Sequence, residues 1–340
     1  MDKATLNDQS DTSMLKVNNL SKFFDVSNSW ITRALENQPR QILKAVDGIS
    51  FEIKKGETFS LVGESGCGKS TVAKLVVGLH EPSNGEIVFD KINLTKAIKE
   101  KETNAIRHRW QMIFQDPYAS LNPRWRVHDI VSEPIRVFKL AKTPFEIRER
   151  VDSLLIQVGL SPDDGRKFPH EFSGGQRQRI SIARALSSEP EFLVCDEPTS
   201  ALDVSVQAQI LNLMMDLQKR LNLTYLFISH NLAIVHHVSN KIGVMYLGKL
   251  CEVASSKELF ASPKHPYTKL LLATLPDMEM TGKERVPVQG EVPNPIDPPT
   301  GCAFHPRCSL ANQRCKQEPP TLIKSDSSFV ACHAVEEDRG

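Results

Sequence analysis

The fold follows from residues 63–70, which read Gly63-Glu64-Ser65-Gly66-Cys67-Gly68-Lys69-Ser70. They fit the pattern GxxxxGK[ST] and lie between an apolar run and a helical pattern. Glycines let the backbone N–H groups of such a turn point inward around an anion, and the start of the helix adds positive potential. We predict a nucleotide phosphate loop in which Lys69 contacts the β- and γ-phosphates and Ser70 binds Mg²⁺.

Strand and helix patterns alternate on both sides of this loop, which predicts a mainly parallel α/β sheet. A polar insert at 27–40 separates the first two strands, and residues 1–13 are polar enough to be disordered. Proline becomes dense from residue 263, so we expect a domain boundary there and a loop-rich C-terminal piece. The expected strands are residues 15–26, 45–53, 57–63, 192–196 and 225–229, and the expected helices are 70–79, 145–158 and 204–221.

Composition excludes several classes of protein. The 42 basic and 41 acidic residues nearly cancel, so the charge attraction that dominates nucleic-acid binding has no source here. No run of about 18 apolar residues is present to span a bilayer, and the first residues lack the apolar core of a secretory signal. We expect a cytosolic protein that binds no nucleic acid.

A second candidate site lies where two further strands end. The apolar strand 192–195 leads into Asp196 and Glu197, which places two carboxylates at the sheet edge beside the phosphate loop. Asp196 would hold Mg²⁺, and Glu197 could polarise the attacking water. His230 follows strand 225–229 and could hold that water in line. Alone, each would be a solvated strand end or a structural histidine; paired with Lys69, the catalytic interpretation is favoured.

Residues 172–179, FSGGQRQR, supply a second backbone nest and a hydroxyl ahead of a helix. With these motifs, residues 15–260 resemble the ATP-binding cassette (ABC) ATPases. The resemblance implies an ABC ATPase domain over residues 14–262, with a mainly parallel P-loop NTPase core, an antiparallel β subdomain and an α-helical subdomain at about 116–190. It also implies two subunits that meet head to tail, because the signature of one contacts the nucleotide of the other.

The resemblance also implies individual roles. Glu197 is the general base, His230 the switch histidine and Gln115 the loop residue that senses Mg²⁺ and the transmembrane partner, while residues 200–203 form the dimer-facing loop. Phe172 stands where leucine is commonest, which we regard as neutral. Phe24, or else Phe23, would stack on adenine.

The resemblance thus implies three sets of site residues. The catalytic residues are Glu197, His230, Lys69 and Gln115. The nucleotide-binding residues are Phe24, Gly63, Glu64, Ser65, Gly66, Cys67, Gly68, Lys69, Ser70, Thr71, Gln115, Asp196, Ser173, Gly174, Gly175 and Gln176. The Mg²⁺ ligands are Ser70, Gln115 and Asp196.

Two flanking phrases narrow the family. Residues 115–124, QDPYASLNPR, and 262–268, SPKHPYT, are similar to those of dipeptide and oligopeptide importers. We therefore expect a peripheral ATPase on the cytoplasmic face of the bacterial inner membrane. Its expected partners are a paralogous ATPase, two permease subunits and, through them, a solute-binding protein. The alternatives are an importer for nickel or glutathione-like solutes, and a soluble ABC regulator without a permease.

Four of the seven cysteines lie in the C-terminal piece, separated by five, six and sixteen residues. In a reducing compartment such a cluster indicates a metal before disulfides. Four thiolates suit either Zn²⁺ or a [4Fe–4S] cluster, and free or oxidised thiols are also open. Resemblance to the peptide-importer group favours iron and sulfur. The expected ligands are Cys302, Cys308, Cys315 and Cys332.

Overall fold

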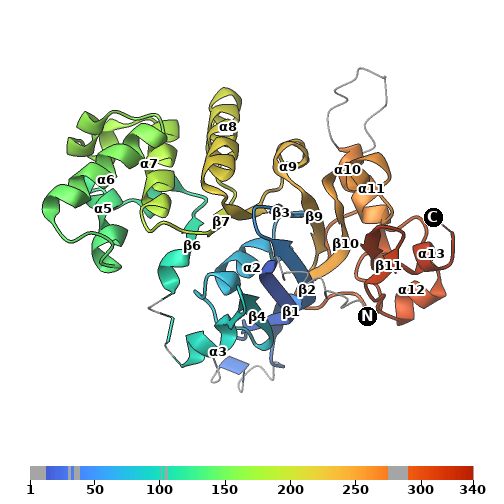
Figure 1. Ribbon diagram of the computed structural model, residues 1–340. Helices are drawn as coiled ribbons and strands as arrows, with labels where there is room; N and C mark the ends of the chain where they lie inside the picture. Colours follow the sequence, from blue (N-terminus) through green and yellow to red (C-terminus); the bar gives the residue numbers. More distant parts are fainter. Residues whose placement is uncertain are drawn as a thin grey trace, which may run out of the picture.

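The computed structural model describes residues 13–29, 32–33, 39–100, 102–103, 106–274 and 290–339 (Figure 1). The larger sheet has the strand order β11-β12-β10-β9-β3-β8-β7-β6, and its members β9, β3, β8, β7 and β6 are parallel. The phosphate loop follows β3, an inner strand of the parallel part that lies between β9 and β8. The strands are β3 (Thr58–Val62), β6 (Trp110–Ile113), β7 (Phe192–Asp196), β8 (Thr224–Ile228), β9 (Lys241–Tyr246), β10 (Lys249–Ser255), β11 (Ile323–Ser325) and β12 (Ser328–Val330).

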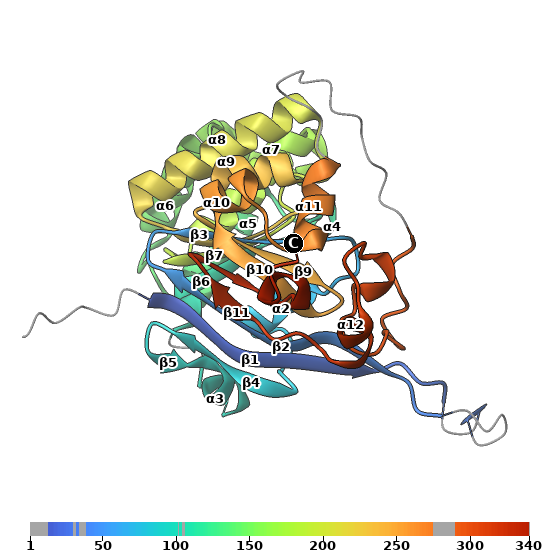
Figure 2. The ribbon, with the colours of Figure 1, turned by 90° about the vertical axis from the view of Figure 1, so that its right-hand side faces the viewer.

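A smaller antiparallel sheet lies beneath the larger one in Figure 2. Helix α2 (Lys69–Val76) contacts β7 and β8 of the larger sheet and β2 of the smaller one, so it lies between the two. Its apolar residues Val72, Ala73, Leu75 and Val76 are buried in the core that both sheets share. The strands of the smaller sheet are β1 (Ser13–Asp25), β2 (Ile42–Lys54), β4 (Asn84–Phe89) and β5 (Ile92–Asn93), and α3 (Leu94–Lys99) follows them.

A group of helices extends from the β6 end of the larger sheet (Figure 1). Helix α6 begins at Pro144, whose fixed φ suits the first helical position, and the Thr143 side chain accepts a hydrogen bond from the N–H of Glu146. These helices share a hydrophobic core with β7 and with the long α8. The elements are α4 (Pro117–Ser120), α5 (Val127–Val137), α6 (Pro144–Gln157), α7 (Gly174–Leu186) and α8 (Val204–Leu221).

The C-terminal residues continue the larger sheet, because β12 pairs antiparallel with β10. The fully buried carboxylate of Glu252 in β10 accepts hydrogen bonds from the N–H groups of Lys264 and His265, and this ties the start of α11 to the sheet. Tyr246, Tyr267 and Phe304 pack on one another in a shared core. The elements here are α9 (Leu232–Val238), α10 (Ser256–Ala261), α11 (Pro266–Ala273), the 3₁₀ turn η4 (His305–Arg307), α12 (Gln313–Gln317) and α13 (His333–Glu336).

Several predicted elements agree with the structure. Residues 192–196 and 204–221 are the strand β7 and the helix α8, and the predicted helix 145–158 is α6, shifted by one residue. Strands β9 and β10 and the hairpin of β11 and β12 were not predicted. The predicted disorder at residues 1–13 falls almost entirely outside the described residues.

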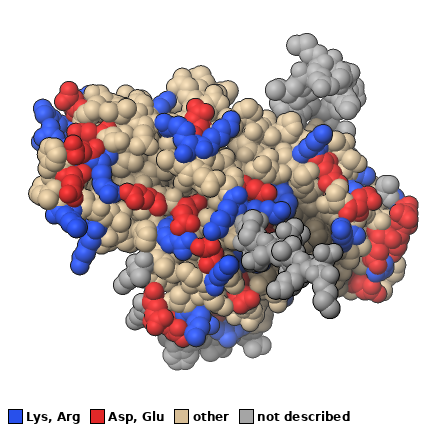
Figure 3. Space-filling model, in the orientation of Figure 1, with Lys and Arg blue, Asp and Glu red and all other residues tan. Residues whose placement is uncertain are grey.

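The distribution of charged side chains and the hydropathy of the helices both relate to the expectation of a cytosolic protein that binds no nucleic acid. Basic and acidic side chains are interspersed over the face shown in Figure 3. In the part of the chain that the structure describes, no helix is both long and apolar enough to cross a membrane.

Candidate active site

At two positions of the phosphate loop only glycine fits, because a side chain would clash with neighbouring backbone atoms. A Cβ at Gly63 would lie 2.1 Å from the Met245 carbonyl oxygen, and one at Gly68 would lie 2.1 Å from the Ala45 carbonyl oxygen. Gly68 also has φ +107°, a conformation that L side chains rarely adopt. The loop is therefore wedged against β2 and β9 and ends at the N-terminus of α2, as an anion site requires.

Lys69 lies over this loop. The residue is only 5% exposed, and its ammonium group donates hydrogen bonds to the carbonyl oxygens of Gly63 at 2.8 Å and Glu64 at 3.0 Å. The Cys67 thiol, 3.7 Å from the same ammonium, is buried, and burial raises its pKa. The charge of Lys69 thus lies where the loop would receive phosphate oxygens.

Ser70 and Asp196 bring together the oxygen ligands that Mg²⁺ prefers. The Ser70 hydroxyl donates a hydrogen bond to Asp196 Oδ1 at 3.0 Å, although the two residues are 126 positions apart. Burial raises the pKa of Asp196, while the hydrogen bond from Ser70 lowers it. A buried carboxylate of this kind is stabilised by a cation, so the pair fits Mg²⁺ in its donor atoms and in its electrostatics.

Glu197 is the residue on which the other polar side chains converge. Gln115 Nε2 donates to Glu197 Oε2 at 3.0 Å, and His230 Nδ1 lies 3.1 Å from Glu197 Oε1. Glu197 has φ +45°, in the left-handed region that a glutamate rarely occupies, and its N–H donates to the Ile228 carbonyl oxygen. Such strain costs about 1–3 kcal/mol and is concentrated at functional sites. The structure thus joins three predicted catalytic residues directly.

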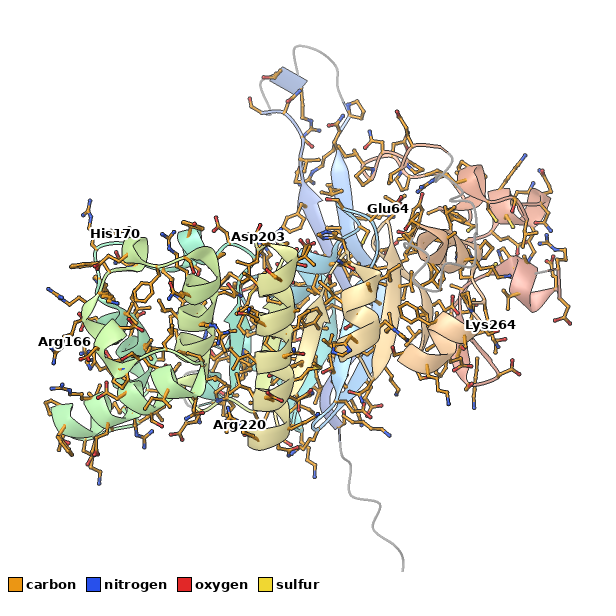
Figure 4. The ribbon with its side chains drawn as sticks, turned by 90° about the horizontal axis from the view of Figure 1, so that it is seen from above. Glu64, Arg166, His170, Asp203, Arg220 and Lys264 are labelled. Atoms are coloured by element: carbon orange, nitrogen blue, oxygen red, sulfur yellow. The ribbon has the colours of Figure 1, made fainter. Side chains whose placement is uncertain are left out.

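The signature residues belong to a different part of the chain. Ser173 caps α7 and forms a capping box with Gln176. Glycines 174 and 175 let the start of α7 pack closely on the start of α8, because a Cβ at Gly175 would lie 2.5 Å from a methyl group of Val206. In Figure 4, His170, just before the signature, lies well apart from Glu64 of the phosphate loop, with Asp203 between them.

The two candidate adenine-stacking residues lie near the end of β1. Phe24 packs edge-on against His80, with a ring-centroid distance of 5.6 Å, and Lys22 Nζ lies 5.2 Å from its ring centroid. Phe23 has Lys44 Nζ 6.0 Å from its ring centroid. Both rings are half-buried, so part of each surface is accessible.

Sequence reasoning missed two residues that contact the phosphate loop from the C-terminal part of the chain. Arg307 forms a bidentate ion pair with Glu64, and the Tyr267 hydroxyl accepts a hydrogen bond from the Glu64 N–H at 2.9 Å. They lie 243 and 203 positions from Glu64, and no local pattern connects such distant residues.

The four C-terminal cysteines line one small cavity, together with His265, Phe304 and His333. Burial, with a smaller contribution from the neighbouring cysteines, raises the pKa of Cys302 to about 11, and burial also raises the pKa of Cys308 and of Cys332. Across the described ranges, however, no set of three or more His, Cys, Asp or Glu side chains is arranged to hold a metal ion. The four predicted ligands therefore line the same cavity, but in this structure their side chains are not arranged to hold a metal ion.

Comparison with known families gives two matches. Residues 46–200 match the ABC transporter family, and residues 251–315 match the family described as the C-terminal region of oligopeptide/dipeptide transporters. Among solved structures, the ATP-binding cassette MJ0796, a dimer bound to ADP and Pi, is 26% identical with TM-score 0.62, covering 72% of this chain and 99% of its own. The cbiO1 protein of Clostridium perfringens is 31% identical with TM-score 0.60, covering 74% of this chain and 92% of its own. These neighbours confirm the predicted ABC ATPase fold.

Curated relatives extend the similarity over nearly the whole chain. The oligopeptide transport ATP-binding protein AppF of Bacillus subtilis is 47% identical, with 94% of this chain and 97% of the relative covered. The di/tripeptide transport ATP-binding protein DppF of Pseudomonas aeruginosa is 45% identical, with 96% and 99% covered. OppF of Escherichia coli is 45% identical, with 88% and 90% covered. The chain therefore belongs to the family of ABC-transporter ATP-binding proteins that includes the oligopeptide and dipeptide transport ATP-binding proteins.

Proposed function

We propose that this chain binds and hydrolyses ATP to energise an ABC importer for dipeptides or oligopeptides. The observation that carries ATP hydrolysis is the convergence of Gln115 and His230 on Glu197, at the sheet edge where Ser70 contacts Asp196. The names of the relatives, which match nearly the full chain at 43–50% identity, support peptide transport as the process that it drives.

The phosphate loop binds the triphosphate of ATP. Backbone N–H groups of residues 63–71 surround the phosphates, Lys69 contacts the β- and γ-phosphates, and Phe24, or else Phe23, stacks on adenine. Mg²⁺, held by Ser70, Asp196 and Gln115, would neutralise charge on the β- and γ-phosphate oxygens. The contact between the Ser70 hydroxyl and Asp196 supports this ligand set.

Glu197 acts as the general base in hydrolysis. It accepts a proton as a water oxygen bonds to the γ-phosphorus, while the bond from that phosphorus to the bridging β-phosphate oxygen breaks, giving ADP and inorganic phosphate. His230 holds the water in line, and Gln115 orients the Glu197 carboxylate. The two short contacts to Glu197 support these roles, because they restrict its position before substrate arrives.

A second ATPase completes each site. The separation of His170 and Glu64 in Figure 4 supports a head-to-tail pair, in which residues 173–176 of one subunit close on the nucleotide of the other, with residues 200–203 at the interface. The MJ0796 neighbour is described as dimeric, which is consistent with such a pair. ATP favours the closed pair and hydrolysis releases it, so that the nucleotide drives a two-state change.

The remaining partners are those of a transporter subunit. We place the chain on the cytoplasmic face of the bacterial inner membrane, with a paralogous ATPase, two permease subunits and, through them, a solute-binding protein. The match of residues 251–315 to a family described for oligopeptide/dipeptide transporters favours peptides over nickel or glutathione-like solutes.

Uptake in source cells tests this function. We expect Lys69→Ala at the native locus to lower uptake of labelled dipeptides or tripeptides roughly 100-fold or more, because a preorganised charge on the transferring phosphate is lost. Ni²⁺ uptake, measured in the same cells, should be unchanged.

Lys96→Ala is the matched control, because Lys96 is an exposed lysine of α3 whose ammonium lies 3.8 Å from Glu100. It should retain wild-type uptake. If the Lys69→Ala cells lost nickel uptake alone, the transported solute would be nickel rather than peptides. If they lost neither uptake, the chain would energise import of neither solute.

We also propose that the four C-terminal cysteines hold a [4Fe–4S] cluster, with Zn²⁺ as the alternative occupant. Their shared cavity supports the proposal, since thiolates are the ligands of both groups. Burial raises the pKa of Cys302, Cys308 and Cys332, so a bound metal would be needed to keep these thiols deprotonated.

Metal analysis after anaerobic purification tests the cluster. We expect iron and sulfide at about four per chain, the content of the cluster in question, and Cys315→Ser should lose both. Cys195→Ala is the control, because Cys195 is a thiol buried in β7 outside the cavity. Zinc alone at one per chain would refute the iron–sulfur assignment.

A further inference from the structure

The phosphate loop carries a negative charge of its own, on Glu64. Within an anion-binding loop such a carboxylate opposes the approach of a triphosphate. Arg307 Nη1 and Nη2 donate to Glu64 Oε2 and Oε1 at 2.8 and 2.9 Å, a planar bidentate pair. The Glu64 side chain is 23% exposed and that of Arg307 only 2%, so solvent screens this pair less than a surface pair.

Arg307 is itself held in place from behind. It belongs to η4, and its guanidinium lies 5.8 Å from the ring centroids of both Tyr246 and Phe304. The Tyr246 hydroxyl accepts a further hydrogen bond from Nη1 at 3.4 Å. The ion pair with Glu64 raises the pKa of Arg307, so the guanidinium stays charged. A fixed cation thus draws the Glu64 carboxylate towards the C-terminal part of the chain.

A second contact fixes the backbone at the same residue. The Glu64 N–H donates to the Tyr267 hydroxyl, and Tyr267 is fully buried in α11. Glu64 is therefore held by its side chain and by its backbone, in both cases by residues after 263. Lys69 in turn donates to the Glu64 carbonyl oxygen, which connects this anchoring to the cation of the loop.

We propose that Arg307 is a positioning residue of the ATP site, which neutralises Glu64 and holds its carboxylate away from the bound phosphates. This inference rests on the proposed binding of ATP at the phosphate loop. The C-terminal segment then contributes directly to nucleotide binding, because removal of Arg307 would leave the Glu64 carboxylate unpaired and free to move beside the triphosphate. ATP affinity, rather than the chemical step, carries the effect.

Nucleotide titration of the full-length chain tests the inference. We expect Arg307→Met to weaken ATP binding about tenfold, the size expected when one charge is exposed near another at the effective dielectric of a protein surface. In ATPase assays the same variant should raise KM with a much smaller change in kcat. Arg307→Lys, which keeps the charge without the bidentate geometry, should recover part of the lost affinity.

The double variant Glu64→Gln/Arg307→Met separates charge from structure. It lacks the ion pair as fully as Arg307→Met does, but it also lacks the exposed carboxylate, so we expect it to regain most of the lost affinity. A merely structural tether would be broken in both variants, and failure of this rescue would overturn the proposal. Unchanged ATP affinity in Arg307→Met would overturn it as well.

Two reference variants complete the design. Arg314→Met replaces another ion-paired arginine of the same segment, which contacts Glu337 at 2.9 Å and lies outside the phosphate loop, and it should bind ATP as the wild type does. Lys69→Ala defines the signal without binding at the loop. If the wild type showed no binding above Lys69→Ala, the proposed function would fail; normal wild-type binding with no effect of Arg307→Met would refute the positioning role alone.

Discussion

Glu197→Gln is expected to leave ATP binding intact and to lower the rate of ATP hydrolysis about 10²- to 10⁴-fold, the usual contribution of a positioned general base. Glutamine has nearly the same shape, so it can occupy the strained backbone position at φ +45°, and its amide oxygen can still accept the hydrogen bond from Gln115. Its amide cannot accept the proton from water. The loss should therefore appear in kcat, with little change in the affinity for ATP.

Steady-state phosphate release and a nucleotide titration on the same preparation measure both quantities. Glu189→Gln is a matched control: Glu189 also has left-handed backbone, at φ +54°, and its carboxylate pairs with Arg150 on the surface. It should hydrolyse ATP at the wild-type rate. Hydrolysis close to wild type in Glu197→Gln would exclude Glu197 as the base.

Local patterns predicted the elements that carry the ATP site. Residues 192–195 are a continuous apolar run followed by the two carboxylates Asp196 and Glu197, and burial on both faces of a parallel strand requires such a run. Residues 204–221 have helical periodicity and end before Asn222 in left-handed conformation, a common helix stop. In these cases the physical cause lies within a few residues, so the sequence alone was sufficient.

Contacts between distant residues could not be predicted in the same way. The pairing of β12 with β10 depends on the path of the chain after residue 263, and β11 and β12 are only three residues long, too short for a periodic signal. The Glu64–Arg307 pair likewise depends on where the tertiary fold brings η4. The left-handed conformation of Glu197 has no sequence signal either, because it is imposed by the contact of its N–H with β8.

The loop itself offers the second large effect. Gly68→Ala is expected to weaken ATP binding roughly 100-fold or more, as about 3 kcal/mol of strain at a left-handed position would do. The added Cβ would lie 2.1 Å from the Ala45 carbonyl oxygen and 2.8 Å from Met245 Cε, so the backbone must move. Because Gly68 is the N-cap of α2, this movement would displace the backbone N–H groups that are proposed to bind the phosphates.

Gly66→Ala is the matched comparison for this effect. Gly66 also has positive φ, +80°, but a Cβ there would meet nothing within 4 Å. It should therefore show only the conformational cost of alanine, about 1 kcal/mol or roughly fivefold in ATP affinity. Thermal melting without nucleotide should report folded protein for both variants, because each change adds one methyl group at a single turn of the loop. Equal loss of ATP affinity in the two variants would show that backbone conformation alone, and not the close approach to β2, makes glycine necessary at residue 68.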